Sequence, residues 1–91
     1  MEQCETLLNK LMSQLREDQQ PALRQRIEGV LASQPGVQQG DQACGLRFLQ
    51  DLDIFVNMRG ADFMYSRGIA ETLRVGEDIF ELAYVMRRAR A

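Results

Sequence analysis

The sequence predicts an all-α fold, a small bundle of four to five helices in which an N-terminal helical hairpin packs on a C-terminal helical group. Apolar residues recur at spacings of three and four, the period of an amphipathic helix. The hydrophobic fraction of 45% is too high for a disordered chain. All four Phe and both Tyr fall after residue 46, so the core should form there, since aromatic side chains bury the most area. A chain of 91 residues should make one domain.

Residues 1–33 are predicted to form the helical hairpin. Residues 2–18 read as an amphipathic helix whose apolar stripe is Cys4, Leu8, Leu11 and Leu15. Pro21 is tolerated only in the first turn of a helix, so we expect a break at 18–20 and a second helix over 21–33. A connection this short favours an antiparallel pair.

A polar loop is predicted over residues 34–43, because two Gly, one Pro and four Gln fall within ten positions. The aromatic-rich helical core should follow over 44–91. Asp41 or Gln42 should cap its first helix, predicted from Cys44 to Met58. The run 53–58 is also strand-like in composition, but with no further strands evident, helix is the more economical reading.

The stretch 59–76 leaves two interpretations open, a turn or a continued helix. Gly60 and Gly68 indicate either a turn near 59–62 capped by Asp62 or a close helix crossing. The fourth helix should then run to about Arg74. After a break at Val75-Gly76, the last helix is expected over 77–90, with acidic residues in its first turn and arginines in its last, as the helix dipole favours.

No motif in the chain predicts an enzyme. Gln42-Ala-Cys-Gly45 approaches a cysteine-protease pattern, but Leu46 replaces its second Gly and the chain contains no His to act as base. Asp51 and Asp53 diverge on a helix, so they form no catalytic pair. No glycine spacing matches a phosphate loop. We therefore expect no cofactor, and no metal site from two cysteines forty residues apart, although a redox role for Cys44 stays open.

The N-terminus favours a cytoplasmic location. It reads Met-Glu-Gln-Cys-Glu, which is acidic where a signal peptide carries positive charge. No apolar run approaches the roughly 20 residues of a membrane span. No helix pairs an apolar face with a Lys/Arg-rich face, so we expect no membrane partner either.

A surplus of large apolar residues predicts a surface that binds protein. So many aromatic and Met side chains exceed what the centre of a 91-residue helical domain needs, and such residues are enriched in interfaces. The alternative is that they fill the core of a monomer. We expect a small non-enzymatic interaction module, binding a protein partner or itself as a homodimer and no small-molecule substrate. Its size and acidity are similar to those of bacterial anti-activators, immunity proteins and small secretion chaperones, with no motif selecting one of them. The predicted partner-binding residues are Phe55, Met58, Phe63, Met64, Phe80 and Tyr84.

An alternative is a DNA-binding regulator, because residues 66–90 resemble a helix-turn-helix unit in their apolar spacing. That resemblance implies phosphate contacts from Arg74, Arg87 and Arg88. Two departures count against it. Arg74 occupies the turn position that such motifs usually give to Gly, and the candidate recognition helix opens with Glu77-Asp78, which would repel phosphates.

Overall fold

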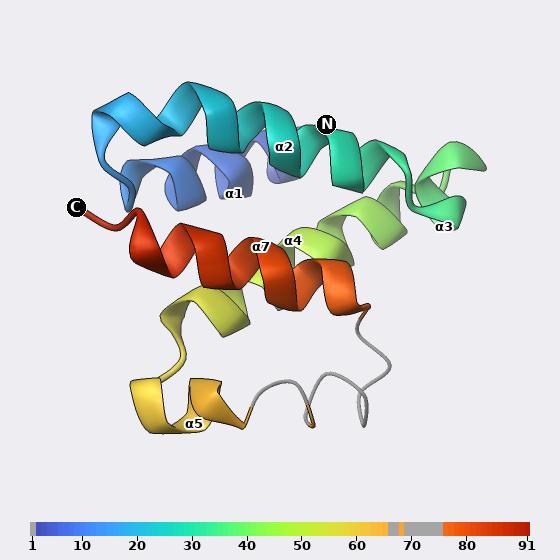
Figure 1. Ribbon diagram of the computed structural model, residues 1–91. Helices are drawn as coiled ribbons and strands as arrows, with labels where there is room; N and C mark the ends of the chain where they lie inside the picture. The colour runs from blue at the N-terminus through green and yellow to red at the C-terminus, as the bar shows by residue number, and fades with distance from the viewer. Residues whose placement is uncertain (1, 66–67, 69–75) are drawn as a thin grey trace.

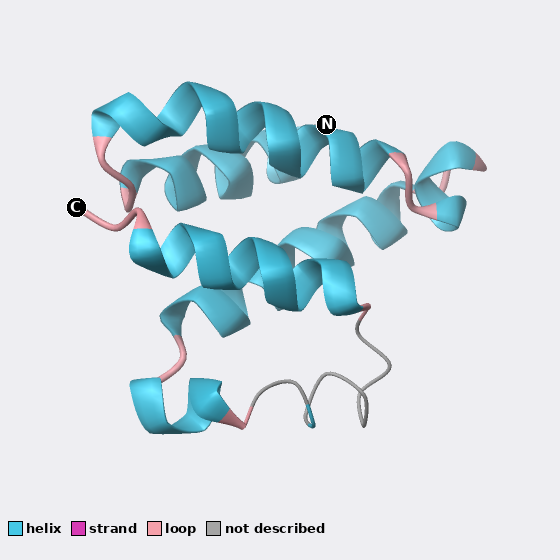
Figure 2. Ribbon diagram, viewed as in Figure 1, coloured by secondary structure: helices cyan, strands magenta, loops and turns pink. Residues whose placement is uncertain are grey.

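The computed structural model describes residues 2–65, 68 and 76–91, and the all-α prediction is confirmed (Figures 1 and 2). The described chain consists of helices joined by short connections, with no strand among them. In chain order the elements are α1 (Glu2–Ser13), the 3-10 turn η1 (Glu17–Gln19), α2 (Gln20–Ala32), α3 (Pro35–Gln38), α4 (Gln42–Asn57), α5 (Gly60–Met64) and α7 (Glu77–Arg88).

The hairpin of α1 and α2 lies on one side of α4 and α7, and α5 lies on the other (Figure 1). α4 packs most extensively against α7 and next against α1. The apolar faces of α1, α2, α4 and α7 meet in a single core, since an amphipathic helix must bury its apolar stripe against another. The completely or almost completely buried side chains include Leu11, Ile27, Leu49, Leu52, Phe55, Val56, Leu82 and Met86.

The first helix ends earlier than the sequence predicts. α1 stops at Ser13 instead of continuing to 18, and Leu15 forms an isolated antiparallel bridge with Arg90. The backbone N–H of Arg16 donates to the carbonyl of Ala89 at 2.9 Å. These backbone groups are bonded to the far end of the chain, so they cannot extend α1. α2 begins at Gln20 with Pro21 in its first turn, close to the prediction.

The predicted polar loop 34–43 contains a short helix, α3. Gly36 within it lies against Cys44, because a Cβ added at Gly36 would stand only 2.7 Å from the Cys44 Sγ. Gly40 adopts a φ of 85°, which glycine tolerates and other residues rarely do. Asp41 caps α4 as predicted: its Oδ1 accepts from the N–H groups of Ala43 at 3.0 Å and Cys44 at 3.3 Å. Because α4 continues to Asn57, the helical interpretation of 53–58 is confirmed up to that residue.

The predicted turn at 59–62 is displaced. The chain breaks at Met58 and Arg59, and Asp62 lies inside the first turn of α5 rather than before it. The remainder of the predicted fourth helix, to Arg74, falls outside the described residues except for Gly68. α7 ends at Arg88, two residues early, since Arg90 pairs with Leu15. Among the described helices, none has both the length and the apolar character needed to cross a membrane.

Candidate binding surfaces

Three of the predicted partner-binding residues lie together. Phe63 of α5 stacks on Phe80 of α7, with ring centroids 5.2 Å apart and planes 4° from parallel. Tyr84, four residues after Phe80 and therefore on the same face of α7, lies 6.4 Å from the Phe63 ring. We call these three residues the aromatic cluster. The cluster joins α5, which ends at Met64, to α7, which begins at Glu77.

Arg87 fixes this cluster to the end of α4. Its guanidinium lies over the Phe63 ring, 4.2 Å from the centroid. Its Nη1 donates to the carbonyls of Phe55, Val56 and Met58, at 3.0, 2.9 and 2.7 Å. The last carbonyls of a helix have no intrahelical partner, so Arg87 satisfies groups that α4 leaves unbonded. Burial lowers the pKa of Arg87, and the positive charge of Arg90 lowers it further.

The other predicted partner-binding residues are placed differently. Phe55 is only 2% exposed and belongs to the core, so this structure does not present its side chain to a partner. It faces inward because α4 is buried along the whole stripe that includes Phe48 and Leu52. Met58 is half-buried and packs against the core, and Met64 is the last residue of α5.

The arginines that the DNA-binding alternative predicts to contact phosphate are also placed differently from one another. Arg74 lies outside the described residues. Arg87 is committed to carbonyls and to a ring, which leaves its guanidinium poorly placed for phosphate. Arg88 is exposed and donates to the Tyr84 hydroxyl at 3.2 Å, with its guanidinium 5.7 Å from the centre of that ring.

A hollow of about 350 Å³ borders the aromatic cluster between α2 and α7. Its lining residues are Arg26, Phe80, Glu81, Tyr84 and Val85. Tyr84 remains 47% exposed at its edge. An exposed aromatic ring beside a hollow, with arginine at the rim, has the composition found at energetically important positions of protein interfaces.

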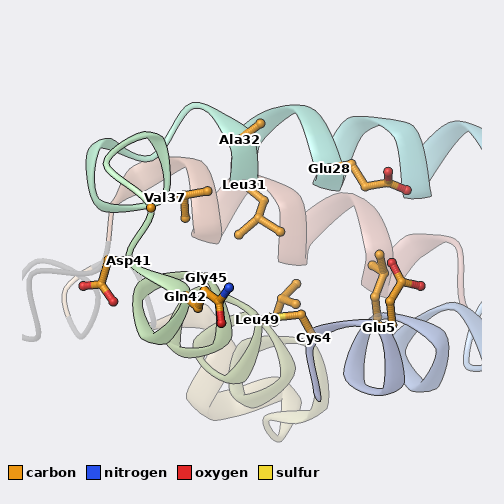
Figure 3. A pocket seen from close by; sticks show the side chains of 12 residues that line it. Cys4, Glu5, Glu28, Leu31, Ala32, Val37, Asp41, Gln42, Gly45 and Leu49 are labelled. Atoms are coloured by element: carbon orange, nitrogen blue, oxygen red, sulfur yellow. The ribbon is translucent and has the colours of Figure 1, made fainter. Parts of the chain in front are cut away.

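The structure contains a second candidate surface, a groove, that the sequence analysis did not predict. An open groove of about 410 Å³ lies where α1, α2 and the start of α4 meet (Figure 3). Its floor and walls are largely apolar, and they comprise Cys4, Leu8, Leu31, Ala32, Val37, Gly45 and Leu49. The sequence feature that could have indicated this groove is Gly45, in the first turn of the helix predicted from Cys44, because glycine lowers the stability of a helix.

Acidic side chains border this groove. Glu5 and Glu28 stand on one side of its apolar residues and Asp41 on the other (Figure 3). The residues that line the groove include no Arg or Lys. Glu28 has a distant ion pair with Arg24, at 3.8 Å, and Asp41 is engaged as the cap of α4. The groove therefore presents apolar surface between regions of negative charge.

Both cysteines are free and half-buried. Cys4 lines the groove, whereas Cys44 lies against Gly36 of α3. Within the described part of the chain, no three His, Cys, Asp or Glu side chains gather in a way that could hold a metal ion.

The sequence matches no protein-family model, and comparisons with curated proteins and with solved structures gave no significant match.

Proposed function

We propose that this chain is a small non-enzymatic protein-protein interaction module that buries the aromatic cluster against a partner protein or a second copy of itself. The observation that supports this proposal is the position of Tyr84. Its ring is 47% exposed, yet it lies near Phe63 and its hydroxyl accepts a hydrogen bond from Arg88. An aromatic side chain held in place before binding loses little conformational entropy when a partner covers it.

The surroundings of Tyr84 favour a partner surface with an apolar centre and acidic edges. The hollow beside the ring could receive an apolar side chain, while Arg26 lines it and Arg88 lies over the same ring. Arginine binds carboxylates through two parallel hydrogen bonds, which would fix the orientation of the partner. Arg87 would act indirectly, by holding Phe63 in place.

Site-specific photo-crosslinking tests this proposal. The photoreactive residue p-benzoyl-phenylalanine replaces Tyr84 in one variant and Tyr65 in another, and both are irradiated in living cells. Tyr65 is the matched control because it is 76% exposed and belongs to no ring contact of the aromatic cluster. We expect a discrete protein adduct from position 84 and none from position 65.

The mass of the adduct identifies the partner. An adduct of twice the mass of the chain indicates self-association, and a different discrete mass indicates another protein. Equal crosslinking from both positions, or no protein adduct from position 84, would overturn the proposal. A nuclease-sensitive adduct would instead favour the DNA-binding alternative.

A further inference from the structure

Gly45 is a buried residue inside α4 where the fold has room for a larger one. A Cβ added there would lie 3.6 Å from Val37 Cγ2, 3.7 Å from Leu31 Cδ1 and 3.9 Å from Cys4 Sγ. All three distances are ordinary van der Waals contacts, so alanine fits. Alanine is also the better helix former. The steric demands of the fold therefore do not explain the glycine.

The space beside Gly45 belongs to the groove. Leu31, Val37 and Cys4, the three side chains that a new Cβ would touch, all line it. Glycine thus keeps the groove deeper at the point where its apolar walls converge. Gly36 provides a contrast, since a Cβ there would stand 2.7 Å from the Cys44 Sγ and glycine is required for packing.

The charge around the groove indicates what would fill it. Its apolar middle would take one or two apolar side chains, which are released from water on binding. Glu5 and Glu28 at one side and Asp41 at the other would attract basic groups that flank them (Figure 3). Arg24 neutralises Glu28 only in part, because its guanidinium lies 3.8 Å from that carboxylate and also bonds to Asn9.

We propose that this groove binds a segment of another protein in which one or two apolar residues lie between Lys or Arg residues. The surface is separate from the aromatic cluster, so the two proposals succeed or fail independently. A module with both surfaces would join two partners, one through Tyr84 and the other through the groove around Gly45.

A pair of synthetic peptides tests the charge requirement. The first is a fluorescein-labelled peptide of about 14 residues, roughly four helical turns, built from two repeats of Lys-Leu-Ala-Lys-Leu-Ala-Lys. The second carries Glu at every Lys position. Fluorescence anisotropy should show saturable binding of the Lys peptide, weakening as salt is raised, and at least about tenfold weaker binding of the Glu peptide.

Two pairs of variants locate the binding. Gly45→Ala should weaken the affinity for the Lys peptide at least about tenfold. Gly29→Ala should leave this affinity unchanged, because Gly29 lies on α2 and a new Cβ there meets nothing within 4 Å. Glu5→Gln with Glu28→Gln should weaken binding and reduce its salt dependence. Glu17→Gln with Asp18→Asn makes the same change of net charge on η1 and should have a much smaller effect.

A labelling measurement gives a second readout. Alkylation followed by mass mapping should show that the bound Lys peptide slows modification of Cys4, which lines the groove, more than that of Cys44. The proposal is overturned if both peptides bind equally or neither binds. It is also overturned if Gly45→Ala folds and retains full affinity, or if the η1 variant loses as much affinity as the groove variant.

Discussion

The guanidinium of Arg87 lies 4.2 Å from the centre of the Phe63 ring, and the same side chain donates to two carbonyls in the last turn of α4. One residue of α7 thus binds the end of α4 and the aromatic ring of α5. Because α5 is short, with only five residues, its own helical hydrogen bonds cannot hold it in place. The position of the aromatic cluster therefore depends on Arg87.

Replacing Arg87 by Ala should lower the free energy of unfolding by about 2–3 kcal/mol. The change removes charge-assisted hydrogen bonds to three carbonyls and a cation–π contact with Phe63. Urea denaturation followed by circular dichroism measures the loss. Arg88→Ala is the control, since the Arg88 side chain is exposed and donates to the Tyr84 hydroxyl, and its removal should cost no more than about 0.5 kcal/mol.

Arg87→Lys shows how much of the stability that Arg87 provides comes from its charge and how much from the shape of the guanidinium. Lysine keeps the positive charge but lacks the planar fork, so it should recover only part of the stability lost in Arg87→Ala. The ring resonances of Phe63 in an NMR spectrum should shift in both variants, because the guanidinium no longer covers the ring. If Arg87→Ala and Arg88→Ala cost the same, Arg87 does not brace the fold.

Three Gly-to-Ala substitutions should change the free energy of unfolding in different directions. Gly29→Ala and Gly45→Ala should each raise the free energy of unfolding by about 0.5–1 kcal/mol, because alanine favours the helix and no atom obstructs its Cβ. Gly36→Ala should lower it by about 1–3 kcal/mol, since its Cβ would clash with the Cys44 Sγ. Thermal melts of the three variants provide the comparison, and destabilisation by Gly45→Ala would mean that a Cβ has no room between Leu31 and Val37.

Asp41→Ala should destabilise the protein by about 1 kcal/mol, because Asp41 Oδ1 accepts from two N–H groups at the start of α4. Asp41→Asn should cost much less, as asparagine caps helices nearly as well. Chemical denaturation distinguishes the two. Equal losses would mean that the carboxylate charge, rather than the capping hydrogen bonds, stabilises α4.

Asp51 should make stability depend on pH. Burial raises the pKa of this carboxyl above its ordinary value of 3.8, and the nearby charge of Arg47 opposes the rise only in part. The folded chain then holds the proton more tightly than the unfolded chain. The free energy of unfolding should consequently fall as pH increases from about 3.8 through the raised pKa.

Asp51→Asn removes this titration, so its stability relative to the parent should grow between acidic and neutral pH. Arg47→Gln should strengthen the pH dependence of the parent, because Arg47 lowers the pKa of Asp51. Denaturation midpoints across the pH range measure both effects. An advantage of Asp51→Asn that is unchanged or shrinks with rising pH would contradict the assignment.

Local sequence patterns predicted most of the helices and part of the candidate surface. Pro21 located the start of α2, and Asp41 was one of the two residues predicted to cap α4, because both act within one helical turn. Phe63, Phe80 and Tyr84 were predicted to bind a partner, and the structure brings them together. Phe55 could not be separated from them by composition alone, since a core phenylalanine and an interface phenylalanine look alike in sequence.

What the sequence by itself determined is the all-α class and the apolar stripes, because helical periodicity and capping are local properties. Tertiary structure alone decided where α1 stops, since the backbone on either side of Leu15 bonds to the backbone on either side of Arg90. It also decided that Arg87 completes α4 rather than facing solvent, and that Gly45 opens onto a groove. Each of these depends on contacts between residues distant in sequence, and periodicity carries no information about which helices meet.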